Sequence, residues 1–183
     1  CSFDEVRSFV GNGIKKAFER ALGRTENINE EEINELVNVF KSYYIEHMYE
    51  VTAPYDGIIE MLEELKEKEY KMAIVSNKYD TAVKELCNKY FRNYITVAIG
   101  EGGDIRKKPS SDGIIKALGE LGKGLDDVVY VGDSEVDIQT AANANIPCIS
   151  VLWGFKDKEF LERNGGIVFA GKPKDIIKII EKN

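Results

Sequence analysis

Two aspartates four residues apart, Asp133 and Asp137, are the clearest candidates for chemistry in this sequence. They follow the apolar run DVVYV at 127–131. If a strand ends before Asp133 and a helix begins after it, both carboxylates can face one point, because four residues span about one helical turn. Two hard oxygens, completed by waters and a substrate phosphate, are a usual way to bind Mg²⁺. The alternative is structural, because acidic residues at a helix N-terminus are stabilised by the helix dipole.

A hydroxyl and an amide, Ser76 and Asn77, follow another apolar run, KMAIV at 71–75. A hydroxyl and free backbone N–H groups at a strand end, just before a helix, can cradle a phosphate. The same residues could instead form a simple Ser/Asn turn. On its own, this segment predicts a phosphate site only weakly.

A basic segment, Arg106-Lys107-Lys108-Pro109, follows the apolar run at 94–100. Pro109 favours an extended conformation for Lys108. The ammonium could neutralise phosphate oxygens or a nucleophilic carboxylate. The alternative is a solvated basic loop. A further turn, Trp153-Gly154-Phe155, is interpreted by itself as structural.

The elements that must position these residues form an alternating pattern from position 51 onward. Continuous apolar runs predict strands buried on both faces, at 71–77, 94–100, 127–134, 146–154 and 166–170. Amphipathic helices lie between these runs, and Pro173 is expected to open the last helix. The pattern predicts an α/β fold with a doubly wound parallel sheet. In such a sheet the ligand lies beyond the carboxyl ends of the strands.

Residues 1–50 carry only helical patterns and predict a small all-helical domain, ahead of an α/β domain at 51–183. Apolar residues recur at helical spacing over Ile14–Leu22. Asn29 is expected to cap a second helix, with Glu32 as its capping-box partner.

Composition and charge exclude several classes of protein. With 43% hydrophobic and 31% charged residues, the chain is typical of a globular protein. A net charge of −7, from 25 basic and 32 acidic residues, argues against a nucleic-acid or anionic-membrane partner. No apolar run approaches the roughly 20 residues of a membrane span, and we expect no signal peptide in the first residues given. Three cysteines without a C-x-x-C pair predict a reduced, cytoplasmic setting.

The single histidine, His47, excludes a multi-histidine zinc site and makes a Ser-His-Asp triad improbable. We interpret His47 as structural, and Cys87 and Cys148 as core residues. Chemistry is therefore expected from carboxylates, hydroxyls, lysines and a hard metal.

Taken together and in order, these segments resemble the haloacid dehalogenase superfamily, most closely its phosphoglycolate phosphatase-like enzymes. The resemblance covers nearly the whole chain, and VGNGIKKAFERAL at 10–22 is similar to the helical cap of that group. The segments that carry it are VTAPYDGIIEMLEELKEKEYKMAIVSNK, KKPSSDGI, VVYVGDSEVDIQTAANA and VLWG. Serines follow Pro109 where the group often has K-P-x-P, a departure that leaves Lys108 in place.

The resemblance implies a role for each candidate residue. Ser76 would be the phosphate-binding hydroxyl, with Asn77 donating from its backbone. Lys108 would offset charge on the nucleophile and on the transferring phosphoryl group. Asp133 would be the principal ligand of Mg²⁺, and Asp137 would support it directly or through water.

The group's D-x-D-G-T motif, which carries the nucleophile, is absent from the 183 residues. Asp56-Gly57 and Asp112-Gly113 each open a helix, and neither follows a buried strand. We expect that one strand, the catalytic loop and a cap helix, roughly 25–35 residues, lie outside this sequence. The strands ending at Ser76 and Gly132 would then flank an unfilled position, and the chain as written is not expected to form an aspartyl-phosphate.

The leading functional hypothesis is a Mg²⁺-dependent phosphatase for a small phosphorylated metabolite such as 2-phosphoglycolate. The helical cap would close over the site, with Gly11, Asn12 and Gly13 as a candidate substrate loop. Pyrophosphate, a nucleotide or a sugar phosphate are alternative substrates. A phosphosugar mutase of the same superfamily and a non-catalytic phosphate-binding module are the alternative functions.

Overall fold

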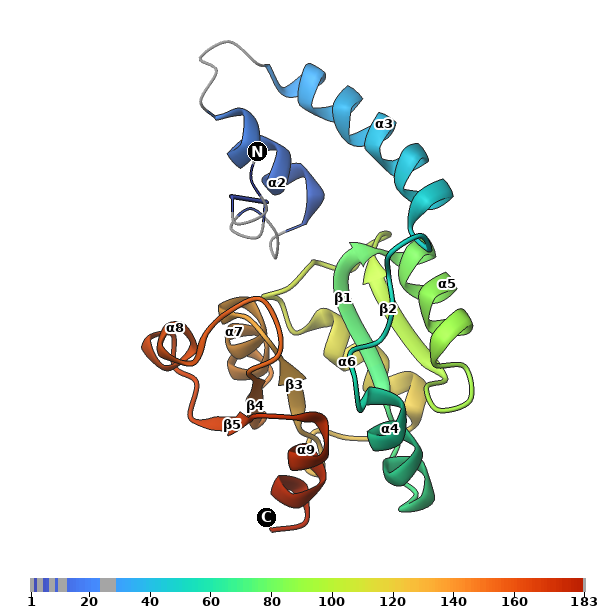
Figure 1. The fold of residues 1–183 in the computed structure, drawn as a ribbon, viewed down its shortest axis with the longest axis vertical. Coiled ribbons are helices and arrows are strands. Elements are labelled where there is room, and N and C mark those ends of the chain that lie inside the picture. The colour runs from blue at the N-terminus through green and yellow to red at the C-terminus, as the bar shows by residue number, and fades with distance from the viewer. Residues whose placement is uncertain (1, 3–4, 7–8, 10–12, 24–28, 183) are drawn as a thin grey trace. The chain divides into compact units, whose positions relative to one another are not determined.

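The computed structural model describes residues 2, 5–6, 9, 13–23 and 29–182 (Figure 1). The chain divides into two compact units, Cys1–Ala53 and Pro54–Asn183. Within the part of the chain that the structure describes, no helix is long and apolar enough to cross a membrane.

The first unit contains helices α2 (Ile14–Leu22) and α3 (Glu30–His47). The predicted capping box at the start of α3 is confirmed. The Asn29 side chain accepts a hydrogen bond from the Glu32 backbone at 3.0 Å, and the Glu32 side chain accepts one from the Asn29 backbone at 2.9 Å. This exchange satisfies N–H groups that the first turn of a helix leaves without partners.

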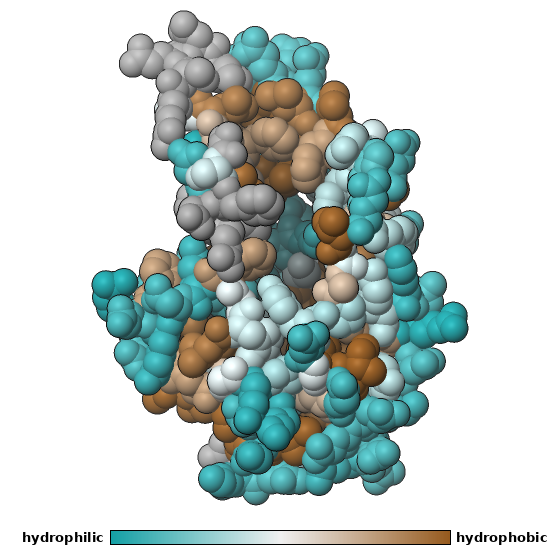
Figure 2. Space-filling view, viewed as in Figure 1, coloured by the Kyte–Doolittle hydropathy of each residue, from teal (hydrophilic) through white to brown (hydrophobic). Residues whose placement is uncertain are grey.

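Aromatic side chains join the two helices, since the rings of Phe18 and Phe40 meet edge-to-face with centroids 5.7 Å apart. Other apolar side chains of α3 remain exposed, including Val39 at 68% and Tyr43 at 61%. Figure 2 shows apolar residues gathered over this unit.

The second unit alternates helices and strands, as the sequence predicts. The helices are α4 (Ile58–Glu67), α5 (Asp80–Tyr90), α6 (Asp112–Leu121), α7 (Glu135–Asn143), α8 (Lys158–Arg163) and α9 (Pro173–Ile180). The strands are β1 (Ala73–Tyr79), β2 (Val97–Glu101), β3 (Tyr130–Gly132), β4 (Cys148–Val151) and β5 (Val168–Ala170). Each strand overlaps its predicted run, and Pro173 opens α9. The predicted α/β class is confirmed.

Every strand pair within the described sheets is parallel, but the strands form two sheets rather than the single predicted one. One sheet has the order β1-β2 and the other β3-β4-β5. In the described structure no ladder joins β1 to β3; the Tyr130 hydroxyl lies 3.5 Å from the Val75 carbonyl oxygen. The break lies between the two strands that the sequence analysis placed beside an unfilled position.

Helices cover both faces of the strands. One buried cluster joins Leu62 of α4 and Ile176 of α9 to Ile149 of β4. Another joins Ile114 of α6 to α7, and the neighbouring Cys148 packs against it. Cys148 and Ile149, which are successive residues of β4, therefore enter cores on opposite faces, as expected of a strand that is covered on both sides.

Candidate active site

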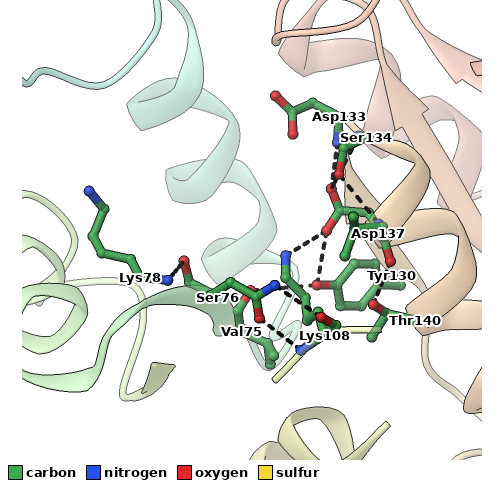
Figure 3. Close-up of polar contacts among 11 residues, drawn as sticks. Val75, Ser76, Lys78, Lys108, Tyr130, Asp133, Ser134, Asp137 and Thr140 are labelled. Atoms are coloured by element: carbon green, nitrogen blue, oxygen red, sulfur yellow. Dashed lines mark hydrogen bonds and ion pairs between the residues drawn. The ribbon is translucent and has the colours of Figure 1, made fainter. Parts of the chain in front are cut away.

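The carboxyl ends of β1, β2 and β3 supply most of the candidate residues. Ser76 and Asn77 lie in the last half of β1, Lys108 lies in the loop between β2 and α6, and Asp133 directly follows β3. An ion pair joins the loop after β2 to helix α7 at this edge: Lys108 Nζ lies 2.7 Å from Asp137 Oδ1 (Figure 3). Parallel strands thus bring together side chains that are far apart in the sequence.

The Lys108–Asp137 ion pair is buried, with side-chain exposures of 13% and 6%. The same Asp137 oxygen also accepts a hydrogen bond from the Tyr130 hydroxyl at 3.3 Å. A charge-assisted hydrogen bond in such surroundings is strong, and breaking it would leave a buried charge without compensation. The Lys108 side chain is therefore withdrawn from solvent, although its neighbours Arg106 and Lys107 are exposed.

The second oxygen of Asp137, Oδ2, accepts three hydrogen bonds. The donors are the Asp133 and Ser134 backbones, both at 3.1 Å, and the Ser134 hydroxyl at 2.6 Å. Burial raises the pKa of Asp137, but the charge of Lys108 and these hydrogen bonds outweigh it, so the pKa lies below its ordinary value. Both oxygens of Asp137 are thus already engaged by protein donors.

Asp133 has different surroundings, and its carboxylate points away from the Lys108–Asp137 pair (Figure 3). Its Oδ2 accepts a hydrogen bond from the Phe155 backbone at 2.9 Å. Burial raises the pKa of Asp133 above its ordinary value, although the Phe155 N–H opposes the shift. No ion pair involves Asp133 among the described residues, and the more distant charge of Lys108 only partly offsets the effect of burial.

Two glycines allow both carboxylates to lie against the backbone. A β-carbon on Gly132 would lie 2.3 Å from Cβ of Asp137, and one on Gly154 would lie 2.2 Å from Cβ of Asp133. The Trp153-Gly154-Phe155 turn, interpreted above as structural, therefore holds Asp133. The available sequence clue was a glycine between two aromatic residues directly after a strand.

Asp133 is the described residue best suited to hold a hard cation. Its carboxylate is partly buried, forms no ion pair in the described structure and lies at the edge where ligands bind such folds. No group of three His, Cys, Asp or Glu side chains is placed to hold a metal within the described ranges. Mg²⁺ suits one or two carboxylates completed by water and phosphate oxygens, so Asp133 fits it without a larger cluster.

We expect Gly154→Ala to weaken Mg²⁺ binding by at least about tenfold, because the new β-carbon must displace the Asp133 carboxylate. We also expect a loss of about 1–3 kcal/mol in the free energy of unfolding, as for other overpacked sites. Titration calorimetry with MgCl₂ and urea unfolding would measure both effects.

Gly119→Ala is the matched control, because its β-carbon would meet nothing within 4 Å. It lies inside α6, where alanine should stabilise the helix by roughly 0.5–1 kcal/mol. Unchanged Mg²⁺ affinity in Gly154→Ala would contradict the role given to this turn.

Ser76, Asn77 and Lys108 line one small pocket. The Ser76 hydroxyl accepts a hydrogen bond from the Lys78 backbone at 3.1 Å (Figure 3). Its own proton remains available for a ligand oxygen, because a hydroxyl both donates and accepts. The Asn77 side chain forms hydrogen bonds with the backbone of Lys108, an interaction that the spacing of the two residues in the sequence does not indicate.

The remaining predicted site residues lie in the first unit. Gly11 and Asn12 fall outside the described residues, and Gly13 is the N-cap of α2 with φ of 85°. Their assignment to a substrate loop stays a prediction. Cys148 is half-buried, and burial raises its pKa to about 11, in keeping with a core thiol.

Comparison with known proteins places this geometry in context. Residues 1–151 match the family described as haloacid dehalogenase-like hydrolase. The phosphoglycolate phosphatase of Aquifex aeolicus is 29% identical over 183 residues, covering 98% of this chain and 81% of that protein. The pyrophosphatase PpaX of Listeria monocytogenes is 27% identical over 178 residues, covering 97% and 79%.

A crystal structure from Lactobacillus delbrueckii subsp. bulgaricus, whose protein is provisionally called a phosphoglycolate phosphatase, superposes with a TM-score of 0.89. It is 32% identical and the match covers 98% of this chain and 83% of that one.

Proposed function

The chain belongs to the haloacid dehalogenase-like hydrolases, and from that premise we propose that it is a Mg²⁺-dependent phosphatase for a small phosphorylated metabolite. The observation that carries the proposal is the separation of charges in one site. Lys108 is paired with Asp137 at 2.7 Å, while Asp133 faces away from that pair. A fixed ammonium and a cation-binding carboxylate together suit a phosphate ester, whose charge must be compensated as the phosphoryl group moves.

Each residue has a distinct task in this proposal. The Lys108 ammonium stabilises negative charge on the transferring phosphoryl group, and Asp137 holds that ammonium in place. The Ser76 hydroxyl donates to a phosphate oxygen. Asp133 holds Mg²⁺, and Asp137 acts at most through water because both of its oxygens are engaged. Mg²⁺, when bound, neutralises charge on phosphate oxygens.

We further propose that the nucleophile is an aspartate outside the 183 residues. Its carboxylate oxygen attacks phosphorus, the bond from phosphorus to the leaving oxygen breaks, and the second aspartate of the same D-x-D-G-T motif gives its proton to that oxygen, so that the alcohol leaves. Water then attacks the phosphorus and gives a proton to this second aspartate, which releases inorganic phosphate and restores the nucleophilic carboxylate. The break between β1 and β3 supports a nucleophile-bearing strand at that position.

The test compares phosphate release by the 183-residue chain with release by the same chain carrying an added N-terminal D-x-D-G-T segment from a relative. We expect turnover with 2-phosphoglycolate only from the extended chain, only with MgCl₂, and none when the first aspartate of the added motif becomes asparagine. Equal turnover by the unextended chain would show that the nucleophile lies among these residues.

The substrate is assigned by comparing kcat/KM for 2-phosphoglycolate, pyrophosphate and glucose 1-phosphate on the extended chain. We propose 2-phosphoglycolate as the preferred substrate. The proposal is supported by the phosphoglycolate phosphatase of Aquifex aeolicus, whose match covers 98% of this chain. A higher kcat/KM for pyrophosphate would move the assignment to the activity named for the Listeria relative.

A further inference from the structure

The side chain of Asn77 makes a reciprocal pair of hydrogen bonds with the backbone of a residue 31 positions away. Asn77 Nδ2 donates to the Lys108 carbonyl oxygen at 3.0 Å, and the Lys108 N–H donates to Asn77 Oδ1 at 2.7 Å. The amide group thus takes the place of a neighbouring peptide in a sheet. The amide of Asn or Gln carries a donor and an acceptor side by side on one planar group, which is the geometry that a reciprocal pair with a peptide requires.

The loop that contains Lys108 needs such an anchor. It runs between β2 and α6, and Pro109 has no N–H with which to join a ladder. The Pro109 carbonyl oxygen accepts a hydrogen bond from Asn143 Nδ2 at 2.7 Å. Amide side chains from β1 and α7 therefore hold two consecutive residues of the loop.

The anchor matters because lysine is long and flexible. Confining its side chain costs up to about 2 kcal/mol of conformational entropy. Lys108 Nζ nevertheless lies at one place, 2.7 Å from Asp137 Oδ1. With the backbone held by Asn77 and the ammonium held by Asp137, the lysine is fixed at both ends.

We propose that Asn77 is a positioning residue that acts through Lys108, holding its backbone so that its ammonium meets the phosphoryl group. This role differs from the phosphate-binding role that the family resemblance implies for the Asn77 backbone. The effect on catalysis rests on the proposed phosphatase function, whereas the effect on the Lys108 backbone does not.

The first test follows amide hydrogen exchange by NMR in the 183-residue chain, without any substrate. Asn77→Ala should speed exchange of the Lys108 amide hydrogen by about tenfold, because the net contribution of one hydrogen bond to stability corresponds to a change of about that size. Asn77→Asp should retain protection of this amide, because a carboxylate still accepts from Lys108 N–H. The control Asn88→Ala removes an exposed asparagine of α5 and should leave the Lys108 amide unchanged.

The second test measures kcat and KM in the extended chain. Asn77→Ala should lower kcat at least about tenfold, with KM changing little. Asn77→Asp should also lower kcat, because it loses the donor to the Lys108 carbonyl. The double variant Asn77→Ala with Lys108→Ala should be no slower than Lys108→Ala alone, because the two residues act as one unit.

Two outcomes would overturn the proposal: Lys108 amide exchange in Asn77→Ala equal to that in Asn88→Ala, or additive losses in the double variant. If Asn77→Ala does not fold, kcat of the near-isosteric variant Asn77→Asp is compared with kcat of the unmodified extended chain instead. Absence of turnover in the unmodified extended chain would instead refute the phosphatase proposal, while the exchange result would still decide the contact.

Discussion

Asparagine in place of Asp133 is expected to reduce Mg²⁺-dependent turnover of the extended chain by at least about a hundredfold, because several kcal/mol of charge stabilisation would be lost. The same substitution should raise the free energy of unfolding without metal by about 1 kcal/mol, as when other functional strain is removed. The reason is that the Asp133 carboxylate is partly buried and forms no ion pair among the described residues, so burial outweighs the more distant charge of Lys108.

The gain in stability should depend on pH in a defined direction. Because the pKa of Asp133 is raised on folding, mainly by burial, its contribution to stability is full below the unfolded pKa of about 3.9 and is lost as pH rises through the folded value. Asparagine cannot ionise. The free energy of unfolding of Asp133→Asn should therefore increase relative to that of the native protein as pH rises from about 4 to 7.

Urea unfolding across this pH range, with and without MgCl₂, measures both effects. Mg²⁺ should stabilise the native protein and leave Asp133→Asn unchanged, because only the former binds it. Asp126→Asn, at an exposed position, is the charge-matched control. Turnover of Asp133→Asn within a few-fold of the native rate would show that the metal assignment is wrong.

Alanine in place of Lys108 is expected to reduce kcat at least about a hundredfold, with a modest rise in KM, because the ammonium acts on charge that develops during transfer. It should also cost about 3 kcal/mol in the free energy of unfolding. This cost arises because the 6%-exposed Asp137 side chain would lose its cationic partner.

The pH dependence of this cost has the opposite sign to that at Asp133. Burial opposes ionisation of Asp137, yet Lys108 and the hydrogen bonds keep its pKa below the ordinary value. The stability gained is therefore present above the unfolded pKa of about 3.9 and is lost as pH falls through the folded value. The difference in the free energy of unfolding between the native protein and Lys108→Ala should accordingly become smaller as pH falls from 5 to 3.

Urea unfolding at several pH values and phosphate release at pH 7 test this prediction. Lys123→Ala removes an exposed lysine and serves as the control for overall charge. An unchanged kcat in Lys108→Ala would show that the Lys108 ammonium does not act on the phosphoryl group and that its role is structural. An unchanged free energy of unfolding would show that the buried pair contributes no net stability.

Local patterns were enough to predict the elements and the edge at which the site lies. Asn29 and Glu32 form the predicted capping box, and Pro173 opens the predicted helix. These features follow from residues within one turn of each other, so the sequence determines them directly. Grouping Ser76, Lys108 and Asp133 at one edge required only that the strands be parallel.

The tertiary structure decided which atoms meet within that site. Asn77 binds a backbone 31 residues away, Lys108 pairs with a carboxylate 29 residues away, and Asp133 accepts from an N–H 22 residues away. Spacing predicted that Asp133 and Asp137 lie close, but not that Lys108 and Ser134 engage Asp137 while Asp133 faces away. Partners and burial depend on how separate strand ends pack, because hydrogen bonds and charges are compensated across space rather than along the chain.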